Sequence, residues 1–145
     1  DLKQKVGGHV SHDVVVRALL EHGFSEDEIV FVGITEIDHD ERDFLDSHDI
    51  PVYMADETEA FVEEYRKTEE PIYLSVDIDV LEEKLAPGTG YLHGELTVED
   101  VENVIERVAP DHADLVEVAP SLDEDGVTVR NARRILKKLG SAVVN

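Results

Sequence analysis

The stretch PIYLSVDIDVLEEKLAPGTG, residues 71–90, begins as an apolar strand, carries two acidic residues and ends in a loop rich in Pro and Gly. Its apolar and β-branched residues over 72–79 are typical of a strand buried in a parallel sheet. Asp77 and Asp79 are two residues apart, so in an extended strand both side chains lie on the same face. They also lie near the carboxyl end of the strand, where parallel sheets bind their ligands. The stretch therefore predicts both a strand and a candidate site.

The two carboxylates have two explanations. Ionised carboxylates that are close together and partly desolvated repel each other, so one takes up a proton or a cation bridges them. Carboxylate oxygens suit Mn²⁺ or Mg²⁺, and added imidazole ligands favour Mn²⁺. Alternatively, Asp77 and Asp79 lie in solvent just past the strand and cap the turn. The spacing alone leaves both interpretations open.

On both sides of this stretch, apolar residues alternate between strand-like and helix-like spacing. This alternation is typical of βα repeats around a mostly parallel sheet, and so of an α/β fold. Thr97 and Asp100 form a start like a capping box for one helix, and Gly140 is expected to end the last helix. Without a linker or a repeat, residues 1–145 are predicted to form a single domain. Further strands are expected at 29–34, 50–55 and 113–119, and helices at 11–22, 57–67, 97–108 and 128–139, with a short helix near 37–45.

The chain is strongly acidic, because 35 Asp and Glu against 13 Lys and Arg give a net charge of -22. An acidic surface repels phosphates, which argues against nucleic-acid binding. The acids alternate with apolar runs, as in folded proteins of salt-loving organisms, and an ordinary acidic cytosolic protein is the other interpretation.

Two classes of feature are missing from the sequence. There is no Cys, which excludes disulfides and thiolate metal sites. No apolar run approaches the roughly 20 residues of a membrane span, and no signal-peptide pattern opens the chain. The cytoplasm is therefore the expected location, with no membrane partner.

Two motifs, taken together, resemble the arginase and agmatinase family of binuclear manganese ureohydrolases. These are SVDIDVLEEKLAPGTG, residues 75–90, and DLVEVAPSLD, residues 114–123. Between them, Leu96 and Thr97 match the family's entry into a helix, so the motifs occur in the expected order. The resemblance implies a three-layer α/β/α fold, of which this chain is the C-terminal portion.

The resemblance assigns roles to five residues. It implies that Asp77 bridges two Mn²⁺ ions, that Asp79 ligates one of them and that Asp1 ligates the other. It implies further that hydroxide formed between the metals attacks a guanidinium carbon, so that a guanidino compound is hydrolysed to urea and an amine. Glu117 pairs with the guanidinium and His12 passes a proton to the leaving amine. The alternatives are a Glu117 that pairs with a structural Lys or Arg, and a His12 that faces solvent at a helix N-terminus.

The chain departs from the family pattern at several positions. Glu82 and Glu83 replace an Asp-Pro pair, the loop after Gly90 is shorter, and Ala119 replaces an Asn. Near His12, the sequence GGHVSHD, residues 7–13, does not match the arrangement of Ser and Asn with which arginases hold an amino-acid carboxylate, which favours agmatine or another guanidino compound over arginine. Arginase, formiminoglutamase and a non-catalytic truncated relative that acts as a binding module are the alternatives.

The similarity covers only the C-terminal part of a complete ureohydrolase. Because the chain begins with Asp1 rather than Met, a segment upstream is expected, and it would contain further metal ligands and the N-terminal strands of the fold. The chain alone is therefore expected to be inactive and to expose a sheet edge or an apolar face. The resemblance also implies a homo-oligomer, either a trimer or a hexamer.

Overall fold

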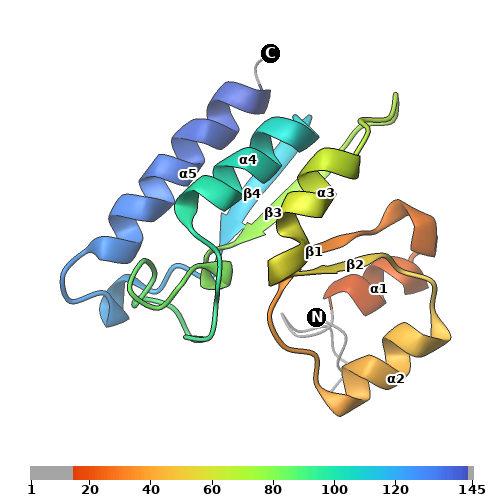
Figure 1. Cartoon of the computed structure of the whole chain (residues 1–145), viewed down its shortest axis with the longest axis horizontal. Coiled ribbons are helices and arrows are strands. Elements are labelled where there is room, and N and C mark those ends of the chain that lie inside the picture. Colours follow the sequence, from red (N-terminus) through yellow and green to blue (C-terminus); the bar gives the residue numbers. More distant parts are fainter. Residues whose placement is uncertain (1–14, 144–145) are drawn as a thin grey trace.

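A computed structural model describes residues 15–143, in which helices and parallel strands alternate along the chain (Figure 1). Single turns of 3-10 helix join several elements, among them η2 (Glu26–Glu28), η3 (Ala55–Glu57), η4 (Ile78–Val80) and η5 (Pro120–Leu122). No helix in this part of the chain is long and apolar enough to cross a membrane. The strands are β1 (Phe31–Ile34), β2 (Val52–Met54), β3 (Tyr73–Asp77) and β4 (His112–Val116), and the helices are α1 (Val15–Glu21), α2 (His39–Ser47), α3 (Thr58–Glu64), α4 (Val98–Val108) and α5 (Val127–Val143).

The strands form two parallel pairs, β1 with β2 and β3 with β4. In the second pair, Tyr73 lies opposite His112 and Asp77 opposite Val116. Within residues 15–143 no ladder joins the two pairs, whereas the sequence predicts one sheet. Each pair therefore has edges that these residues do not pair, and the expectation of an exposed sheet edge stays a prediction.

Helices cover the two strand pairs differently. Helix α3 contacts β1 and β2 from one side, and α1 and α2 lie on the other side (Figure 1). Helices α4 and α5 cover one face of β3 and β4, where Leu74, Val76 and Leu115 join the core. The opposite face of this pair carries Tyr73, which is 63% exposed, and the exposed Val116. Parallel strands with helices packed on them agree with the predicted α/β class.

Helix α4 is the element that the sequence predicts best. The Thr97 side chain accepts a hydrogen bond from the backbone N–H of Asp100, and the Asp100 carboxylate accepts one from the N–H of Thr97 at 2.8 Å. This reciprocal arrangement is the predicted capping box, and it satisfies two N–H groups at the start of the helix. The helix buries Val98, Val101 and Ile105 against α5 and the second strand pair. The prediction of this helix is confirmed.

Other boundaries differ from the predictions. Helix α3 ends at Glu64, and not near residue 67, because the backbone of Tyr65 is extended and the polar residues after it have no apolar side chain to bury. Helix α5 continues through Gly140 to Val143, so the prediction that Gly140 ends it is wrong. A glycine inside a helix costs about 1 kcal/mol. The packing of Leu139 and Ala142 against the core offsets that cost.

Candidate metal and substrate site

Asp77 is the last residue of β3, and Asp79 lies in the turn that follows, within η4. The backbone N–H of Asp79 donates a hydrogen bond to Oδ1 of Asp77 at 3.1 Å. The prediction that both residues lie on one extended strand is therefore wrong, because the Asp77 carboxylate caps the turn and draws the chain out of the ladder. The structure agrees in part with each interpretation of the pair. Asp77 caps a turn, as the second interpretation expects, but both residues are partly buried rather than in solvent, as the first expects.

The surroundings of Asp79 disfavour its ionised form. Burial, the charge of Asp77, a hydrogen bond to Asp77 and the charge of Glu117 together raise the pKa of Asp79 to about 7. These are the two effects that disfavour an ionised carboxylate, namely loss of water and nearby negative charge. A divalent cation between the carboxylates relieves the same repulsion, and carboxylate oxygens are ligands that Mn²⁺ and Mg²⁺ accept. The arrangement therefore fits a cation.

Within residues 15–143, no three His, Asp or Glu side chains form a group that could hold a metal ion. Asp77 and Asp79 could therefore supply at most part of the predicted ligand set. Asp1 and His12, which the resemblance assigns as a metal ligand and as the proton shuttle, lie outside the described residues. Their roles stay predictions.

Glu117 follows directly after β4 and has a φ of 61°. This left-handed backbone is uncommon for a residue other than glycine. The side chain is exposed, and among the described residues no Lys or Arg forms a salt bridge with it. The expectation of an acid inside a buried strand is therefore wrong, and so is the alternative of a structural ion pair within this part of the chain. Its charge still acts on Asp79, so β3 and β4 bring Asp77, Asp79 and Glu117 to one end of the pair.

The loop of residues 86–90 is tied to the start of α5. The N–H of Gly88 donates to Oγ1 of the fully buried Thr128 at 2.7 Å, and the carbonyl of Gly88 accepts from the N–H of Ala119 at 2.8 Å. A Cβ at Gly88 would overlap the Cβ of Asp123, which explains the glycine. The resemblance predicted this loop, but sequence reasoning did not identify its partners. The available signal was an Asp five residues before a Thr at the start of a helix.

The returning chain after this loop approaches the Asp79 turn closely. A Cβ at Gly94 would overlap the backbone of residues 79–81, so only glycine fits there. Parallel bridges join Leu81 to Leu96 and Glu82 to Gly94. The departure from the family pattern in this segment is therefore accommodated by direct backbone contact, which fixes the turn that holds Asp79.

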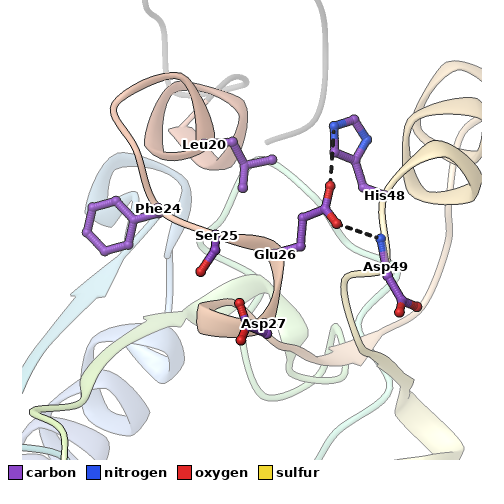
Figure 2. A pocket seen from close by; sticks show the side chains of 7 residues that line it. All are labelled: Leu20, Phe24, Ser25, Glu26, Asp27, His48 and Asp49. Carbon is purple, nitrogen blue, oxygen red and sulfur yellow. Dashed lines mark hydrogen bonds and ion pairs between the residues drawn. The ribbon is translucent and has the colours of Figure 1, made fainter.

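A surface hollow of about 590 Å³ lies away from these residues, between the end of α1 and the end of α2 (Figure 2). Glu26 lies on one side of the hollow and joins the ends of α1 and α2. Its carboxylate accepts a hydrogen bond from the N–H of Asp49 at 3.3 Å and lies 3.9 Å from Nε2 of His48. The His48 ring stacks on Phe44 with 4.0 Å between the ring centroids. Of the residues in 15–143 that the sequence predicts as functional, Asp77, Asp79 and Glu117 do not line this hollow.

The chain is similar to proteins of one known family. The model of the arginase family matches residues 1–140. The N(1)-aminopropylagmatine ureohydrolase of Thermococcus kodakarensis is 31% identical over 138 residues, which are 90% of this chain and 47% of that protein. The agmatinase of Bacillus anthracis is 29% identical over 147 residues, with 96% of this chain and 50% of that protein covered.

Solved structures of similar enzymes have the same fold as this chain. The proclavaminate amidino hydrolase of Streptomyces clavuligerus superposes with a TM-score of 0.79 at 27% identity, and covers 94% of this chain and 49% of its own. The chain thus spans about half of the length of each of these three relatives.

Proposed function

Because the chain belongs to the arginase family, we propose that Asp77, Asp79 and Glu117 form part of the active site of a manganese-dependent ureohydrolase. Its substrate is a guanidino compound, and we propose agmatine. The observation that carries the proposal is the end of the β3–β4 pair, where burial and the neighbouring Asp77 and Glu117 raise the pKa of Asp79 to about 7. Such a concentration of carboxylates suits a cation and a cationic substrate.

Asp77 and Asp79 would hold manganese, with Asp1 as a further ligand. Carboxylates must lose their protons to bind a metal, so binding here replaces the proton that burial favours on Asp79. When bound, manganese supplies Lewis-acid activation of water near neutral pH. The support from the described residues is the donor set, which consists of carboxylate oxygens that suit this metal.

Glu117 would pair with the guanidinium group of the substrate. Its carboxylate is exposed, and no Lys or Arg of residues 15–143 competes for it in a salt bridge. A carboxylate can accept two parallel hydrogen bonds from a guanidinium, which orients the planar group as well as binding it. Orientation of this kind lowers the barrier by holding the reacting carbon in place.

In the proposed reaction, the bond between the guanidinium carbon and the alkyl nitrogen breaks. The oxygen of a water molecule becomes the oxygen of urea, and the leaving nitrogen takes up a proton to depart as an amine. We propose His12 as the donor of that proton, since imidazole titrates near neutral pH. This role rests on the sequence motif at residues 11–13.

The substrate is the finer part of the proposal. The relatives are named as an N(1)-aminopropylagmatine ureohydrolase, an agmatinase and a proclavaminate amidino hydrolase, so the named compound varies among proteins that are 27–31% identical to this chain. The sequence of residues 7–13 does not match the arrangement of Ser and Asn with which arginases hold a carboxylate, which supports agmatine. Arginine, N(1)-aminopropylagmatine and formiminoglutamate are the comparison substrates.

The test is urea release from agmatine by the manganese-loaded holoenzyme. Asp77→Ala is expected to lower kcat/KM by at least about a thousandfold, because it removes a proposed metal ligand. Asp56→Ala is the matched control, since this exposed acid lies in η3, outside the proposed site. Unchanged turnover in Asp77→Ala would refute the metal assignment.

The isolated 145-residue chain is expected to release no urea, because it spans about half of the length of its relatives. The second candidate function is a non-catalytic relative that binds a cation or a partner, and it is favoured by the two-carboxylate donor set of the described residues. A holoenzyme that binds Mn²⁺ through Asp77 but releases no urea from agmatine, arginine or N(1)-aminopropylagmatine, and no formamide from formiminoglutamate, would support that second function.

A further inference from the structure

The backbone of Glu117 needs support from its surroundings. Its φ of 61° is sparsely populated for a residue with a side chain, and such a conformation persists only where neighbouring structure determines it. The Glu117 side chain is exposed, so its own packing does not supply that support. The constraint must come from the residues on either side.

Two sets of contacts bracket Glu117. On one side, Val116 is paired with Asp77 at the end of the β3–β4 ladder. On the other side, the N–H of Ala119 donates to the carbonyl of Gly88 at 2.8 Å, while Val118 packs against the main core. Gly88 is thus the contact that holds the chain two residues beyond Glu117.

Gly88 is itself held by the start of α5. Its N–H donates to Oγ1 of Thr128 at 2.7 Å, and Thr128 has no exposed surface. The Asp123 carboxylate accepts from the N–H groups of Thr128 at 3.2 Å and Val129 at 2.9 Å, which fixes the first turn of the helix. Asn131 adds a bond from its side chain to the carbonyl of Leu85 at 2.7 Å. The loop therefore rests on a rigid, buried helix end.

From this chain of contacts we propose that Thr128 is a positioning residue for substrate recognition. Its hydroxyl fixes Gly88, the carbonyl of Gly88 fixes Ala119, and Ala119 keeps Glu117 in the left-handed conformation that directs its carboxylate to the Asp77 and Asp79 end of the strands. The inference rests on the proposed function, because it gives Glu117 the task of binding a guanidinium. The inference adds that the buried Thr128, which does not touch the substrate, affects the affinity of Glu117 for the guanidinium.

The substitution Thr128→Val keeps the shape of the side chain and removes the hydroxyl. In the manganese-loaded holoenzyme, KM for agmatine is expected to rise about tenfold, because the buried N–H of Gly88 loses its partner and the backbone that holds Glu117 loses its support. The Mn²⁺ affinity, measured by electron paramagnetic resonance, is expected to stay within about twofold of the parent, because the proposed metal ligands are not displaced. Thr128→Ser retains the hydroxyl and is expected to restore KM.

Thr97→Val is the matched control. Like Thr128, Thr97 lies at the start of a helix and uses its hydroxyl in hydrogen bonds, but its partner is Asp100 and not the 86–90 loop. Its loss is expected to lower the thermal midpoint while KM for agmatine is unchanged. An equal rise in KM for Thr97→Val and Thr128→Val would show that general destabilisation is the cause, and would overturn the proposal.

A double-mutant cycle separates positioning from a purely structural role. If Thr128 acts through Glu117, Thr128→Val has no further effect on KM in a Glu117→Gln background. Additive effects of the two substitutions would refute the proposal. Should Thr128→Val fail to fold, Thr128→Ala replaces it in the cycle, because the smaller side chain leaves room for water to bond the N–H of Gly88.

Hydrogen exchange of the Ala119 amide, followed by NMR, tests the structural step without a substrate. Thr128→Val is expected to lower its protection about tenfold, and Thr97→Val to leave it unchanged. If the parent holoenzyme hydrolyses no guanidino compound, the proposed function fails, and this measurement still decides whether Thr128 fixes the backbone beside Glu117. Unaltered protection of Ala119 in Thr128→Val would overturn the inference.

Discussion

The part of the molecule that carries the candidate site is built differently from the part before it. Residues 72–143, here the C-terminal region, place four large side chains at 0–1% exposure, namely Ile78, Leu81, Ile105 and Ile135. Residues 15–65, the N-terminal region, have a separate small cluster of Val16, Phe44 and Ile50, each at 7–8% exposure. Asp77, Asp79 and Glu117 all belong to the C-terminal region. The side chains that must be held in place are thus attached to the larger core, as a pre-organised site requires.

The two regions also differ in their polar contacts. In the C-terminal region the buried hydroxyl of Thr128 and the buried carboxylate of Asp123 tie a loop to a helix. In the N-terminal region the contacts around the hollow, such as that of Glu26 with His48, lie at a solvent-accessible surface (Figure 2). Because buried polar contacts are costly to break and exposed ones are not, the C-terminal region is expected to resist local opening more strongly.

The largest expected effect concerns the two cores. Ile135→Ala in the C-terminal region is expected to lower the free energy of unfolding by about 4 kcal/mol, because a fully buried side chain leaves a cavity. Ile50→Ala, the same substitution in the smaller cluster, is expected to cost about 2 kcal/mol, since that site can relax toward solvent. Urea denaturation followed by circular dichroism measures both values. Equal losses would contradict the difference between the regions.

The second effect depends on pH in the metal-free protein. Burial and the charges of Asp77 and Glu117 raise the pKa of Asp79 from 3.8 to about 7. Between these two values the folded state binds more protons than the unfolded state, so the free energy of unfolding falls as pH rises from about 4 to 7. We expect a decrease of about 2 kcal/mol after allowing for the partial exposure of Asp79.

Chemical denaturation at a series of pH values, with a chelator present, measures this slope. Asp79→Asn is expected to remove most of it, whereas Asp56→Asn in the N-terminal region is expected to leave it unchanged. Added Mn²⁺ is expected to reverse the trend, because the metal binds the deprotonated form. A slope that persists in Asp79→Asn would show that another group titrates.

The sequence predicts an element well where the contacts that fix its ends are made by residues close together in the chain. Helix α4 could be predicted because its capping pair, Thr97 and Asp100, and its apolar spacing are both local in sequence. The end of β3 could not, because the apolar pattern continues to Val80 while the Asp77 carboxylate bonds the Asp79 N–H. The extension of α5 through Gly140 depends on a core made by distant segments.

In the candidate site, too, the sequence predicts the features that depend on neighbouring residues and misses those that depend on distant contacts. The acidic pair was evident from spacing and the motifs, but the left-handed backbone of Glu117 was not, because DLVEV has the composition of a continuous strand. The contact of Thr128 with Gly88 spans 40 residues, and only the folded chain brings them together. The assignments of Asp1 and His12 depend on residues outside the described part.

The third effect compares helix caps in the two regions. Thr97→Ala is expected to cost about 1 kcal/mol, because it removes both hydroxyl contacts at the start of α4. Ser25→Ala is expected to cost only a few tenths of a kcal/mol, since Ser25 precedes the single 3-10 turn η2 and its bond to Glu28 is exposed. Thermal unfolding of both variants gives the comparison. A larger loss for Ser25→Ala would mean that the N-terminal region depends on its surface contacts more than its structure indicates.

The smallest expected effect concerns the ion pairs between α4 and α5, and it also tests the origin of the acidic surface. Arg134 bonds Glu102 at 2.8 and 2.5 Å, and Lys138 bonds Glu106 at 2.6 Å. These groups are partly exposed, so Arg134→Met is expected to cost about 0.5 kcal/mol at low salt and nothing measurable in molar KCl, where the pairs are screened.

The parent protein should respond to KCl in the opposite direction. A net charge of -22 makes self-repulsion larger than the attraction of a few pairs, and salt screens both. If the acidic surface is an adaptation to salt, the thermal midpoint of the parent rises steeply with KCl while its difference from Arg134→Met vanishes. A thermal midpoint of the parent that does not change with KCl would contradict an adaptation to salt and indicate an ordinary acidic surface. If the midpoints of the parent and Arg134→Met still converge in KCl, the ion pair of Arg134 is sensitive to salt although the parent as a whole is not.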